Sequence, residues 1–210
     1  MSKVPTVKYF GVKLQFSLRW NENTDFITGK AASRLVYIRR SILSSLPHLG
    51  EKAYKQLTKP ILEYTCAVWD AAIPKTQSSQ LEAIQWRAAR NVNNIKRTDL
   101  TTSTTKLIKD TQWDELKDRR KKCRFGIIGA KHFNKVATKI SDYIAPHHQT
   151  SLHIRRHTQQ YQIPHCRTKA YQNSFFVCTA KLWNSLSPVP SWLVSLWQVK
   201  AGNVYPDQKL

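Results

Sequence analysis

Acidic residues are scarce in this chain, and that scarcity is its most informative absence. The 210 residues include 13 Asp and Glu against 34 Lys and Arg, which gives a formal net charge of +21. No Asp or Glu occurs from Tyr143 to Pro206. A surplus of this size favours a polyanionic partner such as nucleic acid over an acidic protein or a small substrate.

Long apolar runs, secretion signals and paired cysteines are missing as well. No apolar run approaches the roughly 20 residues that a spanning helix needs, so we expect no membrane partner. The first residues contain no apolar segment and no cleavage site of the secretory type. The four cysteines form no CxxC pair, which suits a reducing compartment and free thiols. We therefore expect an intracellular protein, in the nucleus or the cytoplasm.

Signatures of catalysis are absent too. The only adjacent acidic pair is Asp114 and Glu115, which a helix would point about 100° apart rather than onto one metal ion. We interpret this pair as first-turn charge favoured by the helix dipole. Neither GxxxxGK[ST] nor GxGxxG occurs, so no phosphate-binding glycine loop is predicted. We expect no enzymatic activity, no cofactor and no small-molecule substrate.

Histidines gather in the last third of the chain. His153 and His157 stand at helical i, i+4 spacing, and His165, Cys166 and Cys178 follow. Zinc accepts such ligands, but the usual CxxC or HExxH anchors are missing. We favour the interpretation that neutral histidines add partial positive charge and stacking surface for a nucleic acid.

The apolar residues that are present predict a mainly α protein with a short N-terminal β element. With 41% hydrophobic residues the chain can bury a core. The segment from Lys3 to Leu18 is β-like, and VKYFGVKLQF within it reads as a strand pair with a tight turn around Gly11. Asn21 to Leu46 has helical spacing, and Pro47 ends it.

A second helical segment is predicted over about Glu51 to Ile73, with a kink or a restart at Pro60. It contains the apolar-rich stretch LTKPILEYTCAVWD, which we expect to form the inner helix of a small bundle. The predicted buried stripe consists of Tyr54, Leu57, Ile61, Tyr64 and Val68.

A third helix is predicted to begin at a capping box formed by Ser79 and Glu82. Its apolar side carries Leu81, Ile84 and Ala88, and its other side carries basic residues. A threonine-rich loop follows.

The next helix is predicted to be capped by Thr111 and Asp114. Its expected buried face consists of Trp113, Leu116, Cys123 and Ile127. Between Lys117 and Lys139 there are nine basic residues and one acidic residue.

The last third is expected to be basic and largely irregular, with one short aromatic-rich helix near Ser174 to Leu186. We place a boundary near residue 145. Basic residues alternate there with Tyr and Phe, a combination that grips phosphates and stacks bases.

Nine ordered segments give the chain a family resemblance. They are YFGVKL (9–14), SLRWN (17–21), LVYIRRSI (35–42), LTKPILEYTCAVWD (57–70), LEAIQWRAAR (81–90), QWDELKDRRKKCR (112–124), SDYIAP (141–146), YQIPHCRTKAYQNSFF (161–176) and LWNSL (182–186). Together they resemble the C-terminal part of a jockey-like, LINE-type non-LTR retrotransposon reverse transcriptase. The chain departs from that pattern at Trp86, Cys123 and Cys178, where the family often carries a basic residue.

The resemblance implies a helical thumb and a basic C-terminal region of an RNA-directed DNA polymerase. The paired catalytic aspartates and their Mg²⁺ would belong to a palm that precedes this chain. On this view 1–20 is a remnant β element beside the palm, 21–145 is a thumb-like helical domain, and 146–210 is a basic, aromatic-rich region. The fragment is then expected to lack polymerase activity and to retain nucleic-acid binding.

Eleven basic residues are predicted to contact phosphates. They are Arg39, Arg40, Arg87, Arg90, Arg119, Arg120, Lys121, Lys122, Arg155, Arg156 and Arg167. Two alternatives stay open: an independent nucleic-acid-packaging or structural protein, and a pseudogene fragment without molecular function. The expected partner is RNA, DNA or their hybrid.

Overall fold

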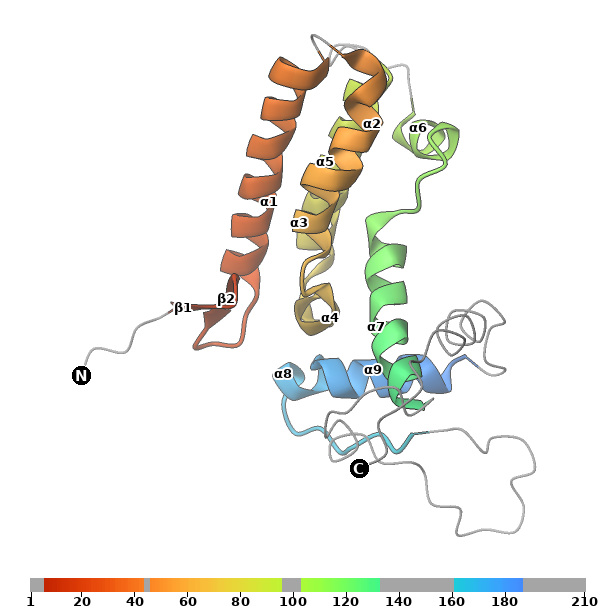
Figure 1. Ribbon diagram of the computed structural model, residues 1–210. Helices are drawn as coiled ribbons and strands as arrows, with labels where there is room; N and C mark the ends of the chain where they lie inside the picture. The colour runs from red at the N-terminus through yellow and green to blue at the C-terminus, as the bar shows by residue number, and fades with distance from the viewer. Residues whose placement is uncertain (1–5, 44–45, 96–102, 133–160, 187–210) are drawn as a thin grey trace, which may run out of the picture. The chain divides into compact units, whose positions relative to one another are not determined.

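The computed structural model describes residues 6–43, 46–95, 103–132 and 161–186 (Figure 1). The described residues are mostly helical, with one two-stranded sheet near the N-terminus, which confirms the predicted fold class. The chain divides into two units, Met1–Lys121 and Lys122–Leu210, and each is considered by itself below. The boundary predicted near residue 145 lies outside the described residues and stays a prediction.

The first unit contains most of the described elements. They are β1 (Thr6–Tyr9), β2 (Val12–Gln15), α1 (Asn21–Tyr37), η1 (Ile38–Leu43), η2 (Pro47–Leu49), α2 (Gly50–Ala53), η3 (Tyr54–Thr58), α3 (Lys59–Glu63), α4 (Cys66–Trp69), η4 (Asp70–Ala72), α5 (Lys75–Val92) and α6 (Thr104–Asp110). Of the η elements, η1 and η3 are π-helical, and η2 and η4 are 3₁₀-helical. Helix α7 (Leu116–His132) crosses the division, and α8 (Lys169–Gln172) and α9 (Phe175–Asn184) belong to the second unit.

The predicted strand pair is a β-hairpin. Strands β1 and β2 pair antiparallel with Tyr9 opposite Val12, so Phe10 and Gly11 form a two-residue loop. Both loop residues have positive φ, 43° and 80°, as a type I′ hairpin turn requires. Gly11 adopts that conformation without steric cost.

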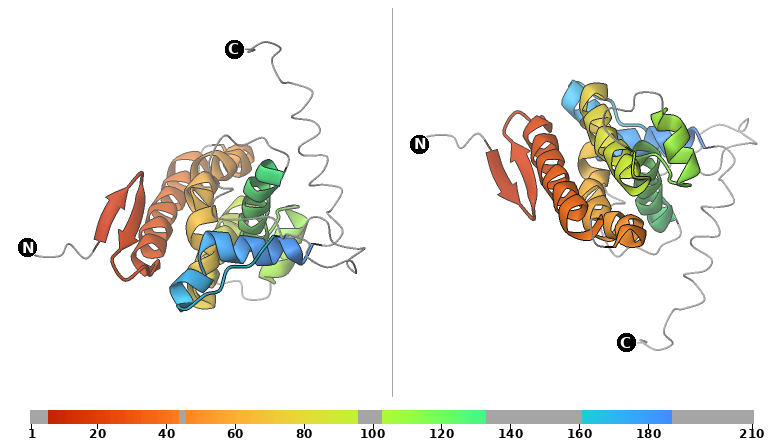
Figure 2. Two further views of the ribbon diagram at one scale, coloured as in Figure 1. Left: turned by 90° about the horizontal axis from the view of Figure 1, so that it is seen from below. Right: turned by 90° about the horizontal axis from the view of Figure 1, so that it is seen from above.

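The hairpin turns its polar face to the first turns of α1, beside which Figure 2 shows it in both views. The side chains of Thr6 and Gln15 donate hydrogen bonds to the two carboxylate oxygens of Glu22, at 2.7 and 3.1 Å. The ammonium groups of Lys8 and Lys13 lie 5.4 and 5.1 Å from the ring centroid of Phe26. The opposite, apolar face of the hairpin is consequently left largely exposed.

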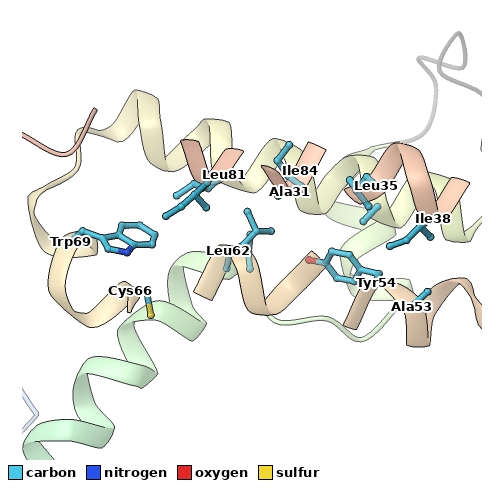
Figure 3. Close-up of a cluster of buried hydrophobic side chains, with 13 residues drawn as sticks. Ala31, Leu35, Ile38, Ala53, Tyr54, Leu62, Cys66, Trp69, Leu81 and Ile84 are labelled. Carbon is cyan, nitrogen blue, oxygen red and sulfur yellow. The ribbon is translucent and has the colours of Figure 1, made fainter. Parts of the chain in front are cut away.

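Buried residues of α1, α3, α4 and α5 build the core of the first unit (Figure 3). Helix α1 contributes positions spaced by three and four, as predicted, and α5 contributes Leu81, Ile84 and Ala88. Trp69 and Leu62 are fully buried in this cluster. The stretch LTKPILEYTCAVWD is therefore interior chain, as the sequence predicts.

The buried stripe of that stretch differs from the prediction. Leu57, Tyr64 and Val68 are exposed, whereas Leu62 and Cys66 are buried. The cause lies in η3, whose π-helical i→i+5 bonding places more residues in each turn. After Tyr54, the next buried position is therefore four residues on instead of three. Pro60 restarts the helix at its first turn, which confirms that part of the prediction.

A left-handed residue separates α3 from α4. Tyr64 has extended, nonhelical dihedrals, and Thr65 follows it with φ 49°. The chain therefore bends at these two residues. The indole Nε1 of Trp69 donates a hydrogen bond to the carbonyl oxygen of Tyr64, 3.2 Å away. This bond folds α4 back on the bend and holds the indole in the core.

The second unit has a small core of its own, formed by Phe125, Ile128, Tyr161, Ala180 and Trp183. The side chain of Asn184 bonds both backbone groups of Tyr161, accepting from its N–H at 2.9 Å and donating to its carbonyl at 2.8 Å. The predicted aromatic-rich helix is confirmed as α9.

Candidate nucleic-acid interface

The solvent side of α1 carries cations and an aromatic ring at helical spacing. Lys30, Arg34 and Tyr37 follow each other at i, i+4 and i+7, and all three are exposed. The buried positions of the helix, such as Ala31 and Leu35, provide its contacts with the core. We call Lys30, Arg34 and Tyr37 the α1 stripe.

The segment that contains the α1 stripe has no acidic residue. From Phe26 to Gly50 there is no Asp or Glu, whereas the same residues include four Lys and Arg. Two of these four, Arg39 and Arg40, are exposed in η1, directly after α1. The α1 stripe and the two η1 arginines thus form a cationic surface without carboxylates of its own.

Within the α1 stripe, Arg34 and Tyr37 contact each other. The guanidinium carbon of Arg34 lies 5.9 Å from the centroid of the Tyr37 ring, which is a cation–π distance. Sequence reasoning named Arg39 and Arg40 but missed all three residues of the stripe. The acid-free segment around them was the signal that would have found them.

The two α5 arginines lie at different depths. Arg87 is exposed, and its Nε donates to the carbonyl oxygen of Ala83 in the same helix at 3.4 Å. Arg90 is half-buried near the end of α5. That end of α5 adjoins η1, because a Cβ built on Gly50 would meet both Leu43 of η1 and Val92 of α5. Arg90 and the η1 arginines are therefore at the same end of the bundle.

The start of α7 is capped by side chains of α5. The backbone N–H of Leu116 donates to Glu82 and Gln85, both at 3.1 Å, and the N–H of Lys117 donates to Glu82 at 2.6 Å. The amide of Gln85 also donates to the carbonyl of Asp114 at 2.9 Å. Two unsatisfied N–H groups of the first turn of α7 are thus bonded by a neighbouring helix.

This arrangement corrects the capping box predicted at Ser79 and the part of the α7 cap predicted at Thr111. Ser79 does not begin a helix, because α5 starts at Lys75 and the Ser79 hydroxyl donates to the Lys75 carbonyl. Glu82 lies inside α5 and serves α7. The hydroxyl of Thr111 bonds carbonyls at the end of α6, so Thr111 does not cap α7.

Arg120 corrects one of the predicted phosphate contacts. Its side chain is fully buried, and its Nε donates to Asp70 at 2.7 Å. One Nη bonds the hydroxyl of Ser78 at 3.0 Å and lies 3.6 Å from Glu82. A guanidinium held in this way inside the unit is unable to reach a phosphate, so Arg120 is a structural residue.

Glu82 links the buried ion pair to the α7 cap. Burial raises the pKa of its carboxyl above the ordinary value, while Arg120 and the two N–H groups of α7 act in the opposite direction. One carboxylate therefore pairs with Arg120 and orients the helix that carries Arg120.

Arg119 has a structural partner as well, because it makes a two-point ion pair with Glu63. Its side chain is 31% exposed. Lys121 and Lys122 are exposed, and Lys122 belongs to the second unit. Cys123 is exposed too, so its predicted burial is wrong.

In the second unit, Arg167 is exposed and lies just before α8. The first turn of α8 is capped by Thr168, whose hydroxyl oxygen accepts a hydrogen bond from the Tyr171 N–H at 3.2 Å. Arg155 and Arg156 lie outside the described residues, as do His153 and His157, so these predictions remain predictions. The predicted contacts that the structure does place lie in η1, α5 and α7 of the first unit and, in the second unit, in α7 and just before α8.

Within residues 6–43, 46–95, 103–132 and 161–186, no group of three or more His, Cys, Asp or Glu is placed to hold a metal ion. In the same part of the chain, no helix has the length and apolar character needed to cross a bilayer.

Comparisons with known proteins add no relative. No family model matches the chain, and no curated protein and no solved structure matches it.

Proposed function

We propose that this chain binds nucleic acid through phosphate contacts and has no catalytic activity of its own. The observation that carries the proposal is the cationic surface of α1 and η1, four exposed Lys and Arg in a segment without carboxylates. Exposed cations release the condensed counterions of a nucleic acid when they bind its phosphates.

The resemblance to the thumb and C-terminal region of a non-LTR retrotransposon reverse transcriptase supports the same proposal. A thumb is a helical element that grips template and primer, and the first unit is a helical bundle with a basic outer side. On this proposal the catalytic aspartates belong to a palm that is not part of this sequence. The purified chain should therefore extend no primed RNA template with Mg²⁺ or Mn²⁺. Extension that co-purifies with the chain would contradict it.

The decisive experiment measures affinity for a labelled single strand at several salt concentrations. Each phosphate neutralised contributes about 0.7 to the slope of log affinity against log salt. If Arg39 and Arg40 each contact one phosphate, Arg39→Gln with Arg40→Gln lowers the slope in magnitude by about 1.4.

A matched control removes two exposed lysines from α6. Lys106→Gln with Lys109→Gln changes the net charge by the same amount, but these lysines lie beside Asp110 and outside the acid-free segment. We expect the control to keep most of the wild-type slope. Equal slopes for all three proteins would exclude the η1 arginines from the binding surface. Equal affinity for single strands, duplexes and primer termini would favour the packaging alternative.

A further inference from the structure

Tyr37 is an aromatic residue with no role in the core. Its side chain is 51% exposed, although it stands in a helix whose neighbouring positions Leu35 and Ile38 are buried. Those two aliphatic residues belong to the core of the first unit. The ring therefore presents an accessible π surface on the cationic side of α1.

Arg34 adds a second planar group to this surface. Its guanidinium lies over the Tyr37 ring at 5.9 Å, one helical turn earlier. Tyrosine rings and arginine planes are the two protein groups on which unstacked nucleobases commonly stack. Lys30 precedes the pair by one more turn, where it is placed to contact a phosphate of the same strand.

We propose that Tyr37 and Arg34 form a stacking site for an unstacked base of single-stranded nucleic acid. This inference rests on the proposed nucleic-acid binding and adds the form of the ligand. In a duplex the bases are already stacked and paired, so an exposed ring gains little from them. A single strand offers free base faces, and stacking tolerates any base because every base has a π face.

The experiment compares the full-length chain on two labelled 12-nucleotide strands, oligo(dA) and an abasic strand of equal length. Both strands carry the same phosphates, so the phosphate contacts contribute equally to both. We expect the wild-type chain to bind oligo(dA) about 5- to 140-fold more tightly than the abasic strand. Tyr37→Leu should remove most of this preference without changing the affinity for the abasic strand or the salt slope. Oligo(rA) should lose affinity in the same variant, because it shares the base.

Two further variants locate the effect. Tyr37→Phe keeps the ring and should keep the preference for bases. Tyr9→Leu removes another exposed tyrosine, 61% exposed in the hairpin, whose ring contacts Phe10 edge to face instead of a guanidinium. It should leave the preference intact. The helical circular dichroism should be the same for all the variants, since the rings are exposed.

The outcomes separate this inference from the function on which it rests. Equal binding of the two strands by the wild-type chain, with a normal salt slope, would overturn the stacking site and keep phosphate binding. An equal loss of preference in Tyr37→Leu and Tyr9→Leu would overturn its placement at Tyr37. If neither strand binds at low salt, the proposed function fails, and the stacking site fails with it.

Discussion

Replacing Arg120 with Leu tests whether the charge of this residue serves the fold or a ligand. Arg120 lies between two carboxylates, Asp70 and Glu82, whose side chains are 9% and 10% exposed. Leucine fills part of the volume but removes the positive charge and three polar contacts. Both buried carboxylates would then lose the guanidinium that lies between them.

The expected loss follows from that geometry. Removing one partner of a buried ion pair costs about 3–5 kcal/mol, because the remaining charge stays uncompensated. With a typical urea dependence of about 2 kcal/mol per molar, the unfolding midpoint should fall by roughly 2 M. The loss should be smaller at about pH 5 than at pH 7, because burial raises the pKa of the Glu82 carboxyl and its protonation removes one of the two buried negative charges.

The assay is urea unfolding followed by far-ultraviolet circular dichroism, with Lys121→Leu as the matched control. Lys121 is the next residue of α7 and is exposed, so its replacement should change the free energy of unfolding by no more than about 0.5 kcal/mol. Arg120→Lys keeps the charge and should lie between the two. A cost for Arg120→Leu equal to that of Lys121→Leu would refute the structural role of Arg120.

Two predictions concern the hairpin and the α7 cap. Deleting residues 1–18 should improve solubility in a sedimentation assay, because Tyr9 and Phe16 are exposed on the hairpin; a loss of helical circular dichroism would instead show that its bonds to Glu22 are needed by the bundle. Burial raises the pKa of Glu82, so its charge is penalised above the folded-state pKa and the penalty is relieved as the pH falls toward the unfolded value. In urea titrations, the free energy of unfolding of the wild-type chain should therefore rise relative to that of Glu82→Gln as the pH is lowered from 7 to 4.5. A fall over the same pH range would mean that Arg120 and the N–H groups of α7 outweigh burial.

Local patterns predicted the hairpin, α1, the restart at Pro60 and α9 from the sequence, because each depends on neighbouring residues. The turn at Gly11 requires positive φ, and the buried positions of α1 repeat with the helical period. The buried stripe after Tyr54 was predicted wrongly because π-helical bonding in η3 changes the helical period. No residue type predicts such a change.

Caps and ion pairs between helices were beyond prediction for a different reason. Glu82 followed Ser79 at capping-box spacing, yet its partners are N–H groups of Leu116 and Lys117, more than thirty positions away. Arg120 stood among exposed basic residues and looked like them. Only its position opposite Asp70 in the folded unit shows that it is a core residue.

The few acidic residues explain why the solvent side is so basic. Five of the 13 make bonds that hold the first unit together: Glu22 to the hairpin, Glu51 to Trp113, Glu63 to Arg119, Asp70 to Arg120, and Glu82 to α7. The last three of these carboxylates form ion pairs with Arg119 and Arg120 of α7. The carboxylates that hold the first unit together thus bond two arginines of α7, Lys55 and polar groups. Cations elsewhere, above all in the acid-free segment of α1 and η1, keep a local surplus of positive charge that an incoming phosphate backbone can use.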